Sequence, residues 1–135
     1  MAVVLDTSFV YDLHVTRNAD RHARAVGLFR DIAAGRHGAC ISNDYVYAEC
    51  NAFATRMGPS RVAAIDAFFF GEPAVVRVAR VDHRMFSEAR RRMLAEAERG
   101  LTLTDWAIVV QSQRHKARVA TFDGALGRAA AGVLP

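Results

Sequence analysis

The hydrophobic positions of the chain follow two alternating patterns. Short apolar runs rich in β-branched residues are typical of buried strands. These strands are expected at residues 2–5, 39–41, 74–81 and 117–122, with a fifth short run at 133–134. Between the runs, apolar residues recur every three or four positions, which predicts amphipathic helices. The longest of these helices are expected at about residues 20–34 and 82–99, and after Ser42, Ser60 and Thr104.

This alternation of strands and helices indicates the fold class. Short, apolar strands separated by helices favour parallel pairing, with helices covering both faces of the sheet. We therefore expect a compact three-layer α/β/α fold with a central, mostly parallel sheet of four or five strands. A length of 135 residues fits one domain spanning residues 1–135.

Several side chains are placed to begin these helices. Asp6 follows the first strand, and Asp82 precedes the longest charged helix. Ser42 and Ser60 precede two helices in the middle of the chain, and Thr102 and Thr104 both precede the helix that contains Trp106. Short oxygen-bearing side chains commonly cap a helix N-terminus, so these residues are the N-cap candidates, with Thr102 and Thr104 as alternatives for the same helix.

Composition excludes several classes of protein. A hydrophobic content of 52% with 24% charged residues is too apolar for a disordered chain. The apolar runs are much shorter than the roughly 20 residues that cross a bilayer, and no basic segment precedes the first strand. We therefore expect a cytoplasmic protein without a membrane partner. Cys40 and Cys50 match no metal-ligand spacing and are expected to be buried, reduced thiols.

The charge balance gives mild support for a nucleic-acid partner. The formal net charge is +4, with 18 Lys and Arg residues against 14 Asp and Glu residues. Arg90, Arg91 and Arg92 span most of a helical turn and could contact an RNA backbone. An equally good interpretation is a solvated helix face on which Glu88 and Glu96 pair with these arginines.

Four carboxylates occupy positions that a parallel sheet brings together. Asp6 ends the first strand, Asp123 ends the fourth, Asp105 stands at a helix start, and Glu49 lies about two turns into another helix. Ligands bind outside the carboxyl ends of the strands in such sheets, so these acids are expected to converge. Taken singly, each has a structural explanation as a cap, a turn residue or a helix-surface acid.

The motifs around these acids resemble those of the PIN-domain nucleases, particularly the VapC-type toxins of toxin–antitoxin pairs. The motifs are Leu5-Asp6-Thr7-Ser8, Glu49 within a helix, Leu103-Thr104-Asp105-Trp106 and Ala120-Thr121-Phe122-Asp123. The resemblance covers nearly the whole chain. It implies a parallel sheet between helices, Mg²⁺- or Mn²⁺-dependent cleavage of RNA, a homodimer, and inhibition by a small antitoxin protein.

The resemblance also implies roles for individual residues. The catalytic, metal-binding acids would be Asp6, Glu49, Asp105 and Asp123. The supporting hydroxyls would be those of Thr7, Ser8 and Thr104. Asp44 lies close enough to Glu49 in the sequence to be an alternative fourth acid.

Clustered carboxylates suit the chemistry of a metal-dependent hydrolase. Mg²⁺ prefers oxygen ligands and activates water for attack on a phosphodiester. An aspartyl-phosphate hydrolase would need a second acid where Ser8 stands, and a receiver domain would need a lysine at a late strand end, whereas Lys116 precedes the fourth strand. The sequence therefore favours a metal-dependent endoribonuclease. The remaining alternative is a PIN-like module that binds RNA or protein without cleaving it.

Overall fold

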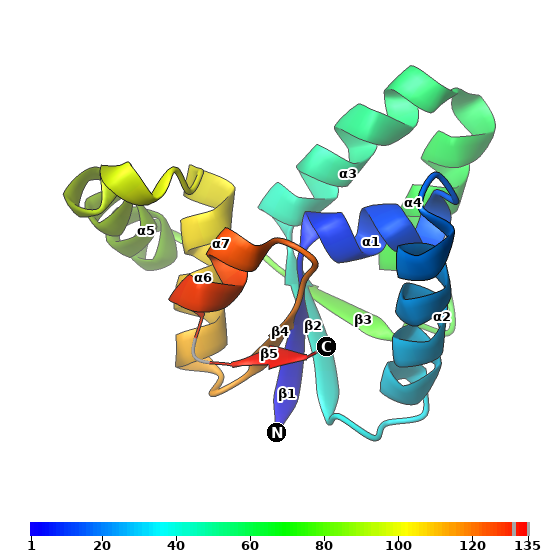
Figure 1. Cartoon of the computed structure of the whole chain (residues 1–135), viewed down its shortest axis with the longest axis horizontal. Coiled ribbons are helices and arrows are strands. Elements are labelled where there is room, and N and C mark those ends of the chain that lie inside the picture. The colour runs from blue at the N-terminus through cyan, green and yellow to red at the C-terminus, as the bar shows by residue number, and fades with distance from the viewer. Residues whose placement is uncertain (131, 135) are drawn as a thin grey trace.

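The computed structural model describes residues 1–130 and 132–134, and it consists of a twisted parallel sheet between two layers of helices (Figure 1). The strands are β1 (Ala2–Leu5), β2 (Ala39–Asn43), β3 (Val76–Ala79), β4 (Arg118–Ala120) and β5 (Val133–Leu134). The α-helices are α1 (Thr7–His14), α2 (Ala19–Ala33), α3 (Asp44–Met57), α4 (Pro59–Phe70), α5 (His83–Ala95), α6 (Leu103–Arg114) and α7 (Gly124–Ala129), and a 3₁₀ turn, Ala97–Arg99, follows α5. Within these described residues, every helix is too short or too polar to cross a bilayer.

The strand order places β1 at the centre of the sheet. The order is β3-β2-β1-β4-β5, and each of these adjacent pairs is parallel. Val4 pairs with Ile41 on one side and with Val119 on the other. The chain moves from β1 to β2 to β3 in one direction and then crosses back to β4. The carboxyl ends of β1 and β4 consequently meet at a topological switch point, where open α/β sheets bind ligands.

Helices cover both faces of this sheet, as the alternating pattern predicted. In Figure 1, α1, α2 and α4 lie on one side of the strands, and α5 and α6 lie on the other. Helix α6 is buried along most of its length, from Trp106 to Ser112, because it packs between the central strands and α5. The three-layer α/β/α fold expected from the sequence is confirmed. Cys40 and Cys50 are buried and unbridged, as expected.

The helix starts correct two of the sequence predictions. Strand β2 continues through Ser42, which therefore belongs to the sheet, and Asn43 caps α3 by accepting a hydrogen bond from the Val46 amide at 3.0 Å. Ser60 lies inside α4, which begins one residue earlier at Pro59. The fixed backbone angle of proline and its missing N–H make it well suited to the first helical position, so no side-chain cap is needed there.

Two strands are shorter than predicted, because polar side chains replace strand pairing at their carboxyl ends. Beyond β3, the Val81 amide donates to the Asp44 carboxylate at 2.7 Å, and Asp82 then caps α5 as expected. Beyond β4, Thr121 turns its hydroxyl toward Asp6 instead of continuing the strand. The residues that end the strands are thus the same ones that begin the neighbouring helices or hold the candidate site.

Candidate metal centre

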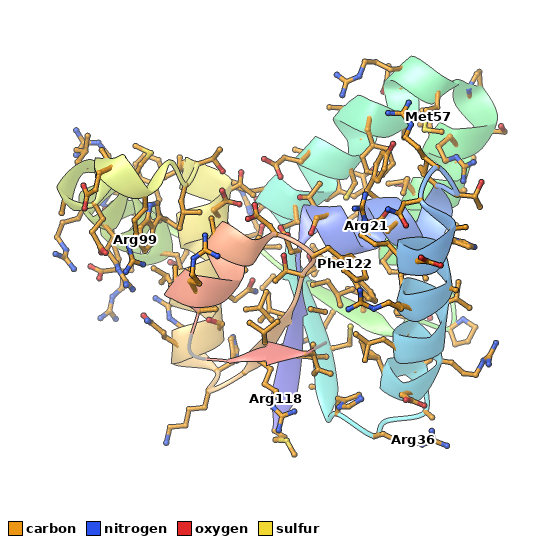
Figure 2. All side chains as sticks on the ribbon, viewed as in Figure 1. Arg21, Arg36, Met57, Arg99, Arg118 and Phe122 are labelled. Carbon is orange, nitrogen blue, oxygen red and sulfur yellow. The ribbon has the colours of Figure 1, made fainter. Side chains whose placement is uncertain are left out.

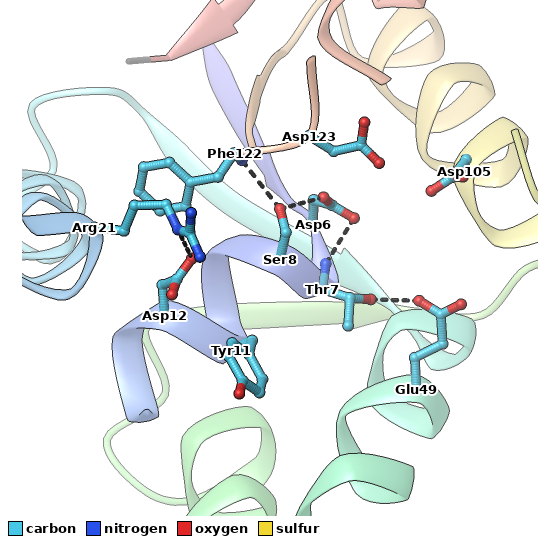
Figure 3. A pocket seen from close by; sticks show the side chains of 10 residues that line it. All are labelled: Asp6, Thr7, Ser8, Tyr11, Asp12, Arg21, Glu49, Asp105, Phe122 and Asp123. Carbon is cyan, nitrogen blue, oxygen red and sulfur yellow. Dashed lines mark hydrogen bonds and ion pairs between the residues drawn. The ribbon is translucent and has the colours of Figure 1, made fainter. Parts of the chain in front are cut away.

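An open cavity of about 510 Å³ lies at the carboxyl ends of β1 and β4 (Figure 3). Its lining residues are Asp6, Thr7, Ser8, Tyr11, Asp12, Arg21, Glu49, Asp105, Phe122 and Asp123. The four acids predicted from the sequence therefore line one cavity, although Asp6 and Asp123 are 117 positions apart in the chain. They come from different elements: the end of β1, α3, the first turn of α6, and the loop after β4.

Asp6 forms the buried floor of this cavity. It caps α1, with its Oδ1 accepting from the Thr7 amide at 2.7 Å. Its Oδ2 accepts from the hydroxyls of Ser8 and Thr121, each at 2.7 Å. The residue is only 4% exposed, and this burial raises the pKa of the Asp6 carboxyl despite the hydrogen bonds, which lower it.

Ser8 and Thr121 connect the start of α1 to the end of β4. Their hydroxyl oxygens lie 3.2 Å apart, and the Ser8 hydroxyl also accepts from the Phe122 amide at 3.0 Å. The Thr121 hydroxyl accepts from the Asp123 amide at 2.9 Å. These bonds fix the Asp6 carboxylate relative to the loop that carries Asp123. Sequence reasoning placed Thr121 within a motif but gave it no role; its position immediately after the fourth strand was the available signal.

Glu49 reaches the cavity from α3, whereas Asp44 does not. Thr7 donates from its hydroxyl to Glu49 Oε1 at 2.5 Å, which ties α1 to α3. Asp44 instead accepts from the Val81 amide and anchors the connection between β3 and α5. Of the two acids that the sequence left open, Glu49 is thus the one that lines the cavity.

Asp105 lies in the first turn of α6 as part of a capping box. Its Oδ2 accepts from the Thr102 amide at 2.9 Å, and the Thr102 hydroxyl accepts from the Asp105 amide at 3.1 Å. Thr102, and not Thr104, is therefore the N-cap, because a capping box requires a spacing of three residues. Thr104 lies within the helix and outside the lining of this cavity.

The environment of Asp105 shows that the carboxylates influence one another. Burial is the largest cause of the raised pKa of the Asp105 carboxyl, and the negative charges of Asp6 and Asp123 raise it further. Asp123 is exposed and caps α7, with its Oδ1 accepting from the amides of Ala125 and Leu126 at 2.9 and 3.2 Å. A carboxyl whose pKa is raised by neighbouring negative charges is placed to gain from a cation.

The donor set fits a hard divalent cation in its chemistry. All four acids offer carboxylate oxygens, which Mg²⁺ and Mn²⁺ prefer. The hydroxyls of Ser8 and Thr121 hold the Asp6 carboxylate in the floor. The present spacing of the four acids is wider than a chelate requires: across residues 1–130 and 132–134, no three acidic, His or Cys side chains lie close enough to hold one ion. Glu49 accepts a hydrogen bond from Thr7, Asp105 belongs to a capping box, and Asp123 caps α7.

The opposite wall of the cavity carries residues that sequence reasoning did not identify. Arg21 donates from Nε to Asp12 Oδ2 at 3.0 Å, and Phe122 lies beside this pair (Figure 3). Asp12 is 3% exposed, so the ion pair has a buried carboxylate and an exposed guanidinium. Tyr11 completes this wall. The spacing of Asp12 and Arg21, on two separate helices, gave no local signal in the sequence.

The α5 arginines proposed to contact RNA lie away from this cavity. Arg91 pairs with Glu88 at 2.7 Å, and Arg92 approaches Glu96 at 3.8 Å. The Arg92 guanidinium also lies 4.8 Å from the centre of the Trp106 ring. These contacts agree with the alternative interpretation, a helix face on which arginines pair with neighbouring acids. They involve Arg91 and Arg92 but not Arg90.

Comparisons with known proteins agree with this fold. The sequence model of the PIN domain family matches residues 3–132. The crystal structure of VapC20 from Mycobacterium tuberculosis, a toxin that cleaves the sarcin-ricin loop, superposes with a TM-score of 0.82 at 24% identity, covering 98% of this chain and 99% of that one. No curated protein sequence matches the chain.

Two toxin–antitoxin complexes also contain chains of the same fold. VapBC2 from Rickettsia felis, bound to a DNA fragment from its promoter, gives a TM-score of 0.70 at 12% identity, covering 100% of this chain and 98% of that one. FitAB bound to a DNA fragment gives a TM-score of 0.69 at 15% identity, covering 97% of this chain and 92% of that one. The likeness to VapC-type toxins that the motifs predicted is thus confirmed at the level of the fold.

Proposed function

The chain belongs to the PIN domain family, and from this membership we propose that it is a metal-dependent endoribonuclease that acts as the toxin of a type II toxin–antitoxin pair. The observation that carries the proposal is the convergence of Asp6, Glu49, Asp105 and Asp123 on one open cavity. A structural explanation suffices for each acid alone, since each accepts a cap or side-chain hydrogen bond. It does not explain why four separate elements present their carboxylates to the same space.

In the proposed mechanism, these four carboxylates hold Mg²⁺ or Mn²⁺. A bound ion would supply Lewis-acid chemistry: it would lower the pKa of water and balance the charge that develops on the scissile phosphate. Asp6 provides the fixed ligand, because Ser8, Thr121 and the Thr7 amide orient both of its oxygens. Glu49, Asp105 and Asp123 lie nearer to solvent and would supply the remaining ligands of a bound ion.

Glu49 can also orient the attacking water. Its Oε1 accepts from Thr7, which fixes the carboxylate and leaves Oε2 to accept a hydrogen bond from water. A base held within hydrogen-bond reach of the nucleophile is the usual requirement for general-base catalysis. Hydrolysis would leave a phosphate monoester on one RNA product and a hydroxyl on the other.

Incubation of a mixed RNA pool with the purified protein and Mn²⁺ tests this proposal. Wild-type protein is expected to cleave RNA, and both EDTA and the Asp6→Asn substitution are expected to abolish cleavage. Asn keeps the size of the side chain and one acceptor oxygen for the cap, so the variant should remain folded. If both proteins bind RNA and neither cleaves it, the chain is an inactive PIN-like binding module.

The partner of the toxin is proposed to be a small antitoxin protein, and the toxin itself is proposed to form a homodimer. The similarity to chains found in the VapBC2 and FitAB complexes supports the antitoxin partner, and the homodimer rests on the family resemblance alone. Co-expression with the neighbouring gene of the operon should yield a co-purifying complex and abolish the ribonuclease activity. A chain that purifies alone and is harmless when overproduced would argue against the toxin role and leave the nuclease proposal intact.

A further inference from the structure

A second cavity, also of about 510 Å³, continues from the acid-lined cavity past Phe122. The two cavities share Arg21, Phe122 and Asp123, so they form one surface depression with two parts. The second part is bounded by α2, α7 and β5, through Arg24, Arg128 and Val133. One end of the depression is therefore lined by carboxylates and the other by guanidinium groups.

Neighbouring groups orient the three arginines of this basic end. Asp12 holds Arg21 through Nε, which leaves the two terminal nitrogens of the guanidinium for another ligand. The Arg24 guanidinium lies 5.3 Å from the centre of the Phe122 ring, within the range of a cation–π contact. The Arg128 guanidinium folds over the start of α7, where a Cβ on Gly124 would lie only 3.2 Å from its Nη1.

The positive charges at this end of the depression have few carboxylate partners. Arg21 has a carboxylate partner in Asp12, whereas Arg24 and Arg128 form no ion pair with any of the described residues. Asp123 is the one acid in the lining of the second cavity, and its Oδ1 is already engaged by the α7 amides. A ligand with several anionic oxygens would satisfy what these guanidinium groups lack.

We propose that Arg21, Arg24 and Arg128 bind the phosphodiester backbone of single-stranded RNA on one side of the scissile phosphate. This inference rests on the proposed ribonuclease function. Guanidinium groups are planar forks that bind phosphate oxygens in pairs, and they are fully charged at any physiological pH. The subsite therefore holds the strand in register while the adjacent acid-lined cavity carries out cleavage.

The dimensions of the depression favour a single strand over a duplex. Each part falls within the roughly 300–1,000 Å³ typical of small-ligand pockets, which suits a nucleotide. Phe122 lines both parts, so a strand that occupies both would pass over its ring. Unpaired RNA can place its bases against such aromatic and guanidinium surfaces, whereas the bases of a duplex are stacked inside it.

Binding of a labelled single-stranded RNA in EDTA tests the subsite without cleavage. Fluorescence anisotropy over a range of salt concentrations gives both the affinity and its salt dependence. The Arg24→Gln/Arg128→Gln variant should raise Kd at least about tenfold, because hydrogen bonds between charged groups are lost. It should also reduce the slope of log K against log[salt] by about 1.4, which is about 0.7 for each lost phosphate contact.

The matched control removes the same amount of charge elsewhere. Arg36 and Arg118 lie at the opposite end of the sheet, near the N-terminus (Figure 2), and line neither cavity. The Arg36→Gln/Arg118→Gln variant should keep the wild-type affinity and salt slope. Equal losses in the two double variants would mean that net charge alone attracts RNA, which overturns the subsite.

Further outcomes separate the subsite from the catalytic proposal. Unchanged binding by Arg24→Gln/Arg128→Gln, in a protein that cleaves RNA with Mn²⁺, would overturn the subsite and leave the nuclease proposal standing. Loss of binding in a protein that never cleaves would do the reverse. If the Gln variant is less stable, Arg24→Lys/Arg128→Lys decides the question: a recovered salt slope supports the phosphate contacts, and a slope that stays reduced contradicts them.

Discussion

The floor and the rim of the acid-lined cavity are built differently. Asp6 in the floor is buried and accepts hydrogen bonds from two hydroxyls and an amide, so both of its oxygens are fixed. The rim acids are half-buried or exposed, and local contacts to Thr7, Thr102 and the α7 amides hold them. In the proposed metal-dependent nuclease, a rigid floor beside a more adjustable rim would hold one ion firmly and still adapt to substrate.

The largest loss of activity is expected from removing a carboxylate of the rim. Asp105→Asn is expected to reduce RNA cleavage about a thousandfold, because losing a metal ligand forfeits several kcal/mol of charge stabilisation in the transition state. The Asn side chain can still accept from the Thr102 amide, so the capping box and the melting temperature should be kept. Cleavage assays with thermal melts on the same preparation measure both quantities.

Normal cleavage by Asp105→Asn would remove this residue from the mechanism and leave its role as a helix cap. Asp44→Asn is the matched control, because Asp44 is an acid near the site in sequence whose carboxylate anchors Val81 outside the cavity. It should cleave RNA at close to the wild-type rate.

The floor can be weakened without touching its charge. Ser8→Ala removes a donor to Asp6 and the acceptor of the Phe122 amide. Groups that orient a metal ligand typically contribute 10–100-fold to metal affinity, so the Kd for Mn²⁺ should rise by about that factor. Calorimetric titration measures it. Thr55→Ala, which removes a hydroxyl bonded only within α3, should leave the Kd unchanged.

The dependence of stability on pH and on Mn²⁺ distinguishes a metal-binding cluster of carboxylates from acids that serve only as helix caps. Burial raises the pKa of Asp6 and of Asp105, so metal-free folded protein holds these protons more tightly than the unfolded chain. That contribution to stability is complete below the unfolded pKa and is lost as pH rises through the raised folded pKa. Mn²⁺ at one hundred times its Kd should restore about 2.7 kcal/mol at pH 7.

Thermal melts with and without Mn²⁺ at neutral and acid pH check this prediction. The Mn²⁺-dependent rise in Tm should be several degrees at neutral pH and should shrink as protons compete for the carboxylates. A melt that Mn²⁺ does not change at neutral pH would count against metal binding by this cavity.

The smallest expected effect concerns a rim contact alone. Thr102→Ala removes the N-cap of α6 and should lower the free energy of unfolding by about 1 kcal/mol. Asp105 keeps its carboxylate, so cleavage should stay within about twofold of wild type. Denaturant unfolding and cleavage assays test the two halves of this statement. A large loss of cleavage would mean that the capping box itself positions Asp105 for catalysis.

The sequence predicted the elements and the convergence of the acids better than their local contacts. Strand ends are readable because an apolar run meets an acid or a threonine, and parallel strands bring those ends to one edge. The helix starts were less readable where several oxygen-bearing residues stand together. Ser42 or Asn43, and Thr102 or Thr104, differ only in where the backbone turns, which long-range strand pairing and the capping box decide.

The basic end of the depression could not be predicted for a different reason. Arg21 and Arg24 lie on α2 and Arg128 lies on α7, and only the folded chain brings them to one cavity. The sequence showed a run of adjacent arginines on α5 instead, and most of those contacts are with neighbouring acids and Trp106. A run of like charges is easy to see in a sequence, whereas three charges that gather through folding are not.

The Ser8–Thr121 contact has a consequence for how the protein is made. It joins residues 113 positions apart, and Asp6 depends on both of these hydroxyls. A polypeptide still emerging from the ribosome, with Thr121 inside the exit tunnel, has no assembled floor for the site. The candidate site is therefore assembled only after nearly the whole chain has been synthesised.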